Sequence, residues 1–211
     1  MTVTPTVDDH RRALGLLTVD EALALGADGV RVLDPWSTLV SSGVVLGRGT
    51  VLYPGVVVQR DGDGVVEVGE DTVLYPGTFL LAAAGGSIRV GARCEVGPGG
   101  VQVKANQPGA SIELGTGVRL LNGCELVGRC RLGDGAQVIG TIAAQSVELG
   151  GGLGGHGHPE PDERGAVLKG AGLARGLRLQ RGDVVNLTPS FDGVPVERQS
   201  TYHPKPSGSS Q

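Results

Sequence analysis

The sequence predicts an all-β fold in which the chain winds as a three-sided coil of short strands. Two segments share T-V-L-Y-P-G at an offset of 22 residues, GRGTVLYPGVVVQ (47–59) and GEDTVLYPGTFLL (69–81). An aliphatic-x-aliphatic-Gly pattern recurs beyond them, with its glycines 22, 22, 24, 18 and 17 residues apart. Within each unit, aliphatic residues return every six positions and each six ends near Gly or Pro. This spacing indicates a short strand followed by a corner, and it is incompatible with an amphipathic helix.

The same period assigns two inward positions in every six residues. The first is aliphatic: Leu46, Leu52, Val58, Val68, Leu74, Leu80, Val90, Val96, Leu114, Leu120, Leu126, Leu132 and Val138. The second, four residues later, is small or β-branched: Thr50, Val56, Thr72, Thr78, Cys94, Gly100, Val118, Cys124, Cys130, Ala136 and Ile142. The three cysteines are therefore expected to be buried as small hydrophobic groups, without a redox or nucleophilic role. Tyr53 and Tyr75 occupy equivalent repeat positions, so we expect them to stack one coil above the other.

Composition and charge exclude several classes of protein. Glycine accounts for 38 of the 211 residues and aromatic residues for 3%, so small aliphatic side chains must fill the core. The net charge of −4 argues against a broad electrostatic surface for nucleic acid or an anionic membrane. The N-terminus lacks the basic-then-apolar plan of a signal peptide, which favours a cytoplasmic protein. Three cysteines without CxxC spacing indicate neither a disulfide framework nor a zinc ribbon.

The repeat resembles that of the hexapeptide-repeat acyltransferase superfamily over roughly residues 30–149. The resemblance implies a single-stranded left-handed parallel β-helix of hexapeptide repeats with a short N-terminal helical cap. It also implies a homotrimer with sites between neighbouring prisms. Spacings longer than 18 residues predict inserted loops at 59–64, 82–87 and 104–110, which should stack as a ridge along one edge.

The segments on either side of the repeat complete the predicted organisation. Residues 1–28 are expected to form the helical cap, with Asp8 or Asp9 capping a first helix, a Thr18-to-Glu21 capping box opening a second, and Gly26 ending it. The β-helix should span 29–149, followed by a Gly/His-rich loop (150–165), a closing coil (166–196) and a flexible tail (197–211).

Both ends of the predicted β-helix carry further similarities. GVRVLDPWST (29–38) is similar to the start of the acetyltransferase domain of bifunctional N-acetylglucosamine-1-phosphate uridyltransferases. Residues 166–185 resemble the closing coil of the superfamily, and Gly-Val-Pro at 193–195 fits the exit that follows it. Trp36, the one tryptophan, is a candidate interface anchor.

HPEPDER (158–164) resembles the HP…ER loop of maltose- and galactoside-type O-acetyltransferases, in which the histidine is the general base. The resemblance implies that His158 takes this role, with His156 as an alternative in the same loop. Glu163, or else Glu160 or Asp162, could orient the ring. The reaction expected is acetyl transfer from acetyl-CoA to a sugar or another small hydroxyl or amine acceptor.

Coenzyme A is expected as a cosubstrate and not as a permanently bound cofactor. Its phosphates need cations, and the closing coil offers Lys169, Arg175, Arg178 and Arg181. The alternative is that these side chains, like Lys104, only form a solvated face. No metal is expected, because the carbonic anhydrases of this fold use three histidines, whereas only His156 and His158 are suitably placed.

A non-catalytic scaffold or small-ligand-binding protein is the rival prediction. The chain lacks the extra coil that O-acetyltransferases place between the HP loop and the closing coil, and it has no Asn-Tyr-Asp-Gly-like sugar signature. A metal-dependent hydratase is the third alternative.

Overall fold

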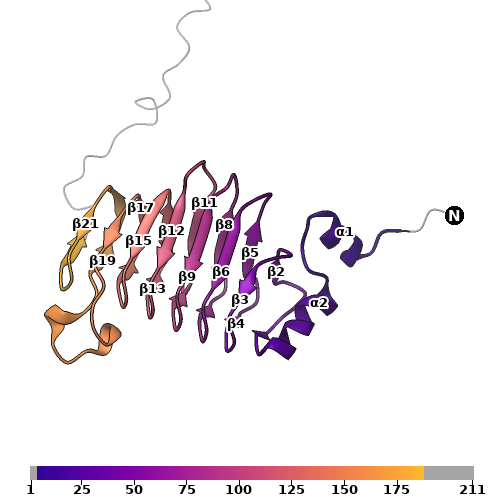
Figure 1. Cartoon of the computed structure of the whole chain (residues 1–211), viewed down its shortest axis with the longest axis horizontal. Coiled ribbons are helices and arrows are strands. Elements are labelled where there is room, and N and C mark those ends of the chain that lie inside the picture. Colours follow the sequence, from indigo (N-terminus) through magenta and orange to yellow (C-terminus); the bar gives the residue numbers. More distant parts are fainter. Residues whose placement is uncertain (1–3, 188–211) are drawn as a thin grey trace, which may run out of the picture.

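The computed structural model describes residues 4–187, which form a prism of stacked coils with helices at one end (Figure 1). The Gly-Val-Pro exit at 193–195, the last part of the predicted closing coil and the tail from residue 197 lie outside these residues.

Three parallel sheets form the sides of the prism, and each coil contributes one strand to each of them in turn. The first face consists of β1 (Arg31–Val32), β4 (Val51–Leu52), β7 (Val73–Leu74), β10 (Glu95–Val96), β13 (Arg119–Leu121), β16 (Gln137–Ile139), β19 (Val167–Gly170) and β22 (Val184–Leu187). The second face consists of β2 (Leu39–Val40), β5 (Val57–Arg60), β8 (Phe79–Ala82), β11 (Gln102–Ala105), β14 (Glu125–Val127), β17 (Ile142–Gln145) and β20 (Gly172–Arg175). The third face consists of β3 (Val45–Leu46), β6 (Val65–Val68), β9 (Ser87–Val90), β12 (Ser111–Leu114), β15 (Arg129–Leu132), β18 (Glu148–Leu149) and β21 (Arg178–Leu179). The predicted all-β parallel β-helix with a short helical cap is confirmed.

The core is a stack of aliphatic side chains in register. Leu52 pairs with Leu74, Leu74 with Val96 and Val96 with Leu120 in successive strands, and all four are fully buried. The other predicted aliphatic positions are buried too, except Leu46, which is half-buried in the first coil. The six-residue period therefore identified the core correctly.

At one of the inward positions assigned to a small residue, the prediction was wrong. Gly100 lies in a turn with φ +75°, and Val101 is the fully buried residue at that level. The reason is that the Gly97–Gly100 corner is one residue longer than the others, which brings Val103 into register with Leu80.

The inserted residues lengthen strands on both sides of one corner. They extend β5 and β6, β8 and β9, and β11 and β12 to four residues each. The extensions stack: Asp61 N–H donates to the Ala82 carbonyl (2.8 Å), and Ala83 N–H donates to the Ala105 carbonyl (3.0 Å). Ala82 and Ala105 are fully buried between the extended strands. We call residues 59–64, 82–87 and 104–110 the ridge.

Two short helices precede the prism, α1 (Val7–Ala13) and α2 (Val19–Ala24). Thr6, and not Asp8 or Asp9, caps α1: its hydroxyl accepts from Asp9 N–H (3.2 Å), and the Asp9 carboxylate accepts from Thr6 N–H (2.8 Å). A hydroxyl three residues before an acid makes a complete capping box, which a single aspartate cannot. The predicted box of Thr18 and Glu21 opens α2.

The helical segment continues further than predicted. Gly26 does not end it, because a 3-10 turn, η1 (Leu25–Asp28), follows α2, and Gly29 stops that turn in the left-handed conformation with φ +82°. None of the helices in the described part of the chain is long and apolar enough to cross a membrane.

The helical cap is tied to the first coil. Leu17 N–H donates to the Val40 carbonyl (2.8 Å), and the guanidinium of Arg11, only 5% exposed, donates to the carbonyls of Pro35 (2.9 Å) and Trp36 (2.8 Å). The indole of Trp36 itself is exposed, as an interface anchor would be in an isolated chain.

Candidate functional site

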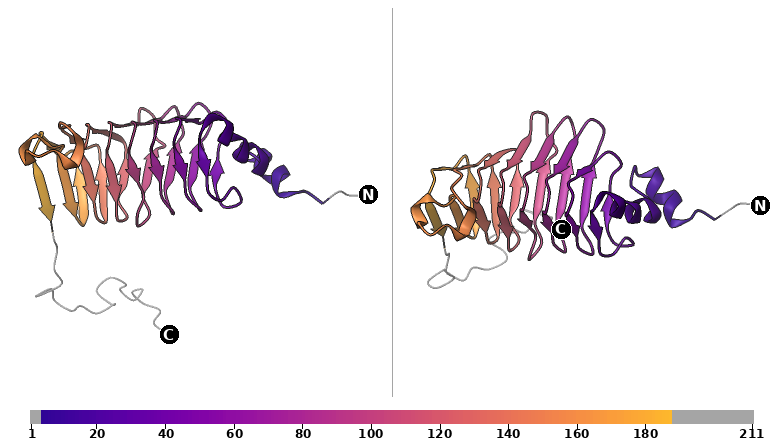
Figure 2. Two further views of the ribbon diagram at one scale, coloured as in Figure 1. Left: turned by 90° about the horizontal axis from the view of Figure 1, so that it is seen from below. Right: turned by 60° about the horizontal axis from the view of Figure 1, so that its bottom comes forward.

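The Gly/His-rich loop leaves the prism at the corner between the third and first faces. It joins β18 to β19, contains the short turns η2 (Gly155–Gly157) and η3 (Pro161–Glu163), and projects from the end of the prism opposite the helices (Figure 2). Gly152 N–H donates to the Asp134 carbonyl (2.8 Å), and Leu153 N–H donates to the Glu163 carbonyl (2.7 Å). These bonds anchor the start of the loop to the prism and to the end of the loop.

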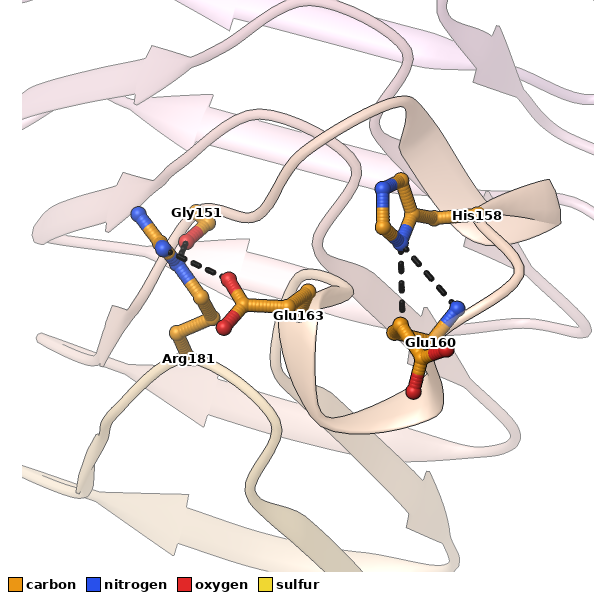
Figure 3. Close-up of polar contacts among 5 residues, drawn as sticks. All are labelled: Gly151, His158, Glu160, Glu163 and Arg181. Atoms are coloured by element: carbon orange, nitrogen blue, oxygen red, sulfur yellow. Dashed lines mark hydrogen bonds and ion pairs between the residues drawn. The ribbon is translucent and has the colours of Figure 1, made fainter.

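Two arginines hold the loop in place, Arg181 of the closing coil and Arg164 of the loop itself. Arg181 forms an ion pair with Glu163 (Nη1 to Oε2, 2.8 Å), and its Nε donates to the Gly151 carbonyl (3.2 Å). Arg164 Nε donates to the His158 carbonyl (2.7 Å). The carboxylate of Glu163 therefore faces Arg181 and not His158 (Figure 3).

Backbone atoms of Glu160 orient the ring of His158. Its Nδ1 lies 3.2 Å from the Glu160 amide nitrogen and 3.3 Å from the Glu160 carbonyl oxygen. With the proton on Nδ1, the ring donates to that carbonyl and leaves a lone pair on Nε2. With the proton on Nε2, Nδ1 instead accepts from the Glu160 amide. The ring packs against Gly154: a Cβ added at Gly154 would lie 3.0 Å from His158 Cδ2.

A cleft of about 550 Å³ separates the loop from the first face. His156 lines it from the loop side, and Arg93, Glu95, Arg119 and Asp134 line it from the coils. Arg119 and Glu95 are ion-paired across neighbouring strands (3.0 Å). His156 and His158 thus have different surroundings, a mixed-charge cleft for the first and the Glu160 backbone for the second.

These cleft residues of the prism were not predicted from the sequence. They lie in the three coils before the loop, at positions that appear only as polar sites in the repeat. The signal available was that Glu95 and Arg119 are 24 residues apart, the spacing between the corresponding glycines Gly91 and Gly115.

The four candidate phosphate ligands are distributed over different parts of the closing coil. Lys169 on β19 and Arg175 on β20 line one apolar groove of about 310 Å³, together with Leu168, Leu173 and Leu177. Arg178 lies on the third face beside Glu148 (3.4 Å), and Arg181 holds the loop. The chain therefore brings together Lys169 and Arg175 but not all four cations. Lys104 is not simply solvated, because its Nζ is paired with Glu125 (2.7 Å).

All three cysteines are buried and free, as predicted. Burial raises the pKa of Cys94 to about 11 and that of Cys124 to about 12, and it also raises the pKa of Cys130. Such thiols are poor nucleophiles, because the reactive form is the thiolate. Among residues 4–187, no three His, Cys, Asp or Glu side chains gather closely enough to hold a metal ion.

No model of a known protein family matches the sequence, and no curated protein matches it. The parallel β-helix fold is compatible with hexapeptide-repeat proteins.

Proposed function

We propose that this protein is a CoA-dependent acyltransferase in which His158 is the general base. The observation that carries the proposal is the contact of His158 Nδ1 with the Glu160 carbonyl, at 3.3 Å. A carbonyl at this position favours the tautomer whose Nε2 can accept a proton, and it stabilises the imidazolium that forms when Nε2 does so.

The reaction is acetyl transfer to a sugar or another small hydroxyl or amine acceptor. Nε2 takes the proton of the acceptor as its oxygen or nitrogen attacks the thioester carbonyl carbon of acetyl-CoA. The tetrahedral oxyanion then collapses, the carbon–sulfur bond breaks, and the imidazolium returns the proton to the CoA thiolate. Backbone N–H groups of the glycine-rich loop are suited to hold the oxyanion.

The groove at the end of the prism supports acyl-CoA binding. Its apolar wall suits a pantetheine arm, and Lys169 and Arg175 at its margin suit phosphates. An acyl-CoA cosubstrate is consistent with a cytoplasmic location.

A homotrimer would join the two parts of the site. The loop leaves the corner between the third and first faces, whereas the groove lies near the corner between the first and second faces. Apolar side chains occupy outward positions on the first face (Val51, Val73) and on the second (Val57, Phe79, Leu81). We propose that these faces meet neighbouring copies, so that the loop of one copy lies beside the groove of the next.

Thermal shift with CoA and acetyl-CoA tests cosubstrate binding. A ligand at about 100 times its Kd adds about 2.7 kcal/mol to the stability of the native state, so millimolar CoA should raise Tm clearly. Lys169→Ala with Arg175→Ala should remove the shift. No shift in the wild-type protein contradicts the proposal.

Turnover of acetyl-CoA with a panel of sugars and amines tests the base. His158→Ala should lower kcat by about 10²–10⁴-fold while the CoA-induced thermal shift remains. His156→Ala is the matched control, since it alters the same loop but leaves the Glu160 contact in place. Equal losses in the two variants, or full activity of His158→Ala, would remove His158 from this role.

One observation favours the rival function, a scaffold or small-ligand binder without catalysis. The Glu160 amide lies as close to Nδ1 as the carbonyl does, and Glu163 is held by Arg181. A ring that accepts from this amide carries its proton on Nε2 and cannot act as a base there. NMR of ¹⁵N-labelled histidine separates the two: a protonated Nδ1 in neutral His158 supports catalysis, and a protonated Nε2 supports the rival.

A further inference from the structure

The third face carries a ladder of alternating charge. Successive strands place Glu67, Arg89, Glu113, Arg131, Glu148 and Arg178 at paired positions. The other two faces show no such alternation in the described residues, because their outward positions are largely apolar or mixed. We call these six residues the charge ladder.

Contacts within the chain use only some of the hydrogen-bond donors and acceptors of the charge ladder. Ion pairs join Arg89 to Glu67 (3.1 Å), Arg131 to Glu113 (2.9 Å) and Arg178 to Glu148 (3.4 Å). The six side chains remain between 44% and 74% exposed. Each guanidinium has five N–H donors, so each arginine retains donors for a further carboxylate.

Read in the opposite direction along the prism, the charge ladder has the opposite sign at every position, so two antiparallel copies are complementary in charge. We propose that the third face binds a second copy of this chain in antiparallel orientation. The two-fold axis passes between Glu113 and Arg131. Glu113 then faces the partner's Arg131, Arg89 faces the partner's Glu148, and Glu67 faces the partner's Arg178. Each contact occurs twice. A parallel copy in register would set every charge against its like, which disfavours that arrangement.

The shape of the prism fits the same arrangement. The ridge widens the corner between the second and third faces in the coils of β6, β9 and β12, whereas this corner is short in the coils of β15, β18 and β21. A two-fold axis lying in the interface, perpendicular to the prism, keeps these corners on the same side and reverses the order of the coils. The ridge of each copy then lies beside the short corners of the other, which avoids a collision.

This interface is independent of the proposed acyltransferase activity. It uses the third face, while the proposed trimer uses the first and second faces. A protein that forms only the ladder contact is a dimer. In a trimer built from the other two faces, the third face points away from the trimer axis, so the ladder contact joins each trimer to three others and does not close a hexamer. In either case the loss of the ladder contact lowers the mass, to that of a monomer or of a trimer, whether or not the protein transfers acyl groups.

Paired charge reversals test the ladder. Glu113→Arg alone sets the introduced guanidinium against the partner's Arg131, and Arg131→Glu alone sets the introduced carboxylate against the partner's Glu113. We expect each variant alone to associate at least about tenfold more weakly than the wild type and to sediment at micromolar concentration with a lower mass, that of a monomer or of a trimer. A mixture of the two variants restores both contacts at the axis and should recover the wild-type mass as a heteromer. Glu70→Arg, an exposed reversal outside the ladder, is the control.

Mass and thermal stability together distinguish the proposed interface from a purely structural role of the charge ladder. If the charges only stabilise the stacking of coils, both variants lose thermal stability, all masses stay equal and mixing restores nothing, which overturns the proposal. If either reversal prevents folding, Arg131→Gln and a salt titration of the wild type take its place. Association that does not weaken with added salt overturns it as well, since exposed charge contacts are screened.

Discussion

Tyr75 stacks on Tyr53 across one coil, with ring centroids 5.1 Å apart and ring planes inclined by 24°. Both rings precede a Pro-Gly corner, and the pairing of Leu52 with Leu74 sets their register. The predicted stack is therefore confirmed. It ends after two rings, because Gly97 takes the corresponding position in the next coil.

The tyrosine stack should contribute a measurable coupling energy. Aromatic pairs of this kind add about 0.5–1.5 kcal/mol beyond the area they bury. A double-mutant cycle with Tyr53→Leu and Tyr75→Leu, measured by urea unfolding, should give a coupling in this range. Tyr53→Leu combined with Leu153→Ala, in the distant loop, should be additive. Additive effects in the tyrosine cycle would contradict an energetic role for the stack.

Gly97 should tolerate substitution less well than Gly55. Its φ is +134°, and a Cβ there would come 2.6 Å from Tyr75 Cβ and 2.6 Å from Thr78 Oγ1. Gly55 also has positive φ, +74°, but a Cβ there would meet nothing within 4 Å. We expect Gly55→Ala to cost about 1–2 kcal/mol and Gly97→Ala to cost clearly more, by chemical denaturation. Equal losses would show that the close contacts relax freely.

The buried thiols should make stability depend on pH in the alkaline range. The ordinary pKa is 9.0, and the folded values for Cys94 and Cys124 are about 11 and about 12. Because the folded state binds these protons more tightly, the contribution is complete below pH 9 and is lost as pH rises through the folded values. The slope is about 1.4 kcal/mol per pH unit for each thiol. The stability difference between the wild type and Cys94→Ala/Cys124→Ala should therefore shrink from about pH 9 to pH 10.5, and a constant difference would refute the expectation.

Arg11 should hold the helical cap against the first coil. Arg11→Met removes donors from the carbonyls of Pro35 and Trp36. Hydrogen bonds from charged groups are worth about 1.5–3 kcal/mol, so we expect a loss of about that size, together with faster hydrogen exchange over residues 31–40. Arg12→Met, at the adjacent exposed position, should change neither measurement. Identical behaviour of the two variants would argue against the anchor.

The core was predictable because every coil repeats one geometric rule. A buried aliphatic residue every six positions is a requirement of the prism, so Leu74 or Leu120 could be assigned without any structure. The exceptions are local. The extra residue at Gly97–Gly100 shifted the phase by one and moved burial from Gly100 to Val101. The cap of α1 was misassigned because several residues could serve, and only the folded geometry selects Thr6.

The candidate site was less predictable, since it depends on residues that are distant in sequence. The loop and its histidines were visible from composition, but the partners of Glu163 and His158 were not. Arg181 comes from the coil below the loop, and the atoms nearest His158 Nδ1 are backbone atoms, for which no side-chain pattern gives a signal. The charge ladder has the same origin, because its alternation appears only when the register of the strands is known.

The number of rungs in the charge ladder is even, and this matters for self-recognition. Six alternating rungs begin with glutamate and end with arginine. Only an even number of rungs has this property, since an odd number would begin and end with the same charge and oppose like to like on reversal. Loss of the coil that carries Glu67 or Arg178 would leave five alternating rungs, and two reversed copies in full overlap would then set like charges against each other. The length of the β-helix therefore determines which copies of the chain can recognise each other.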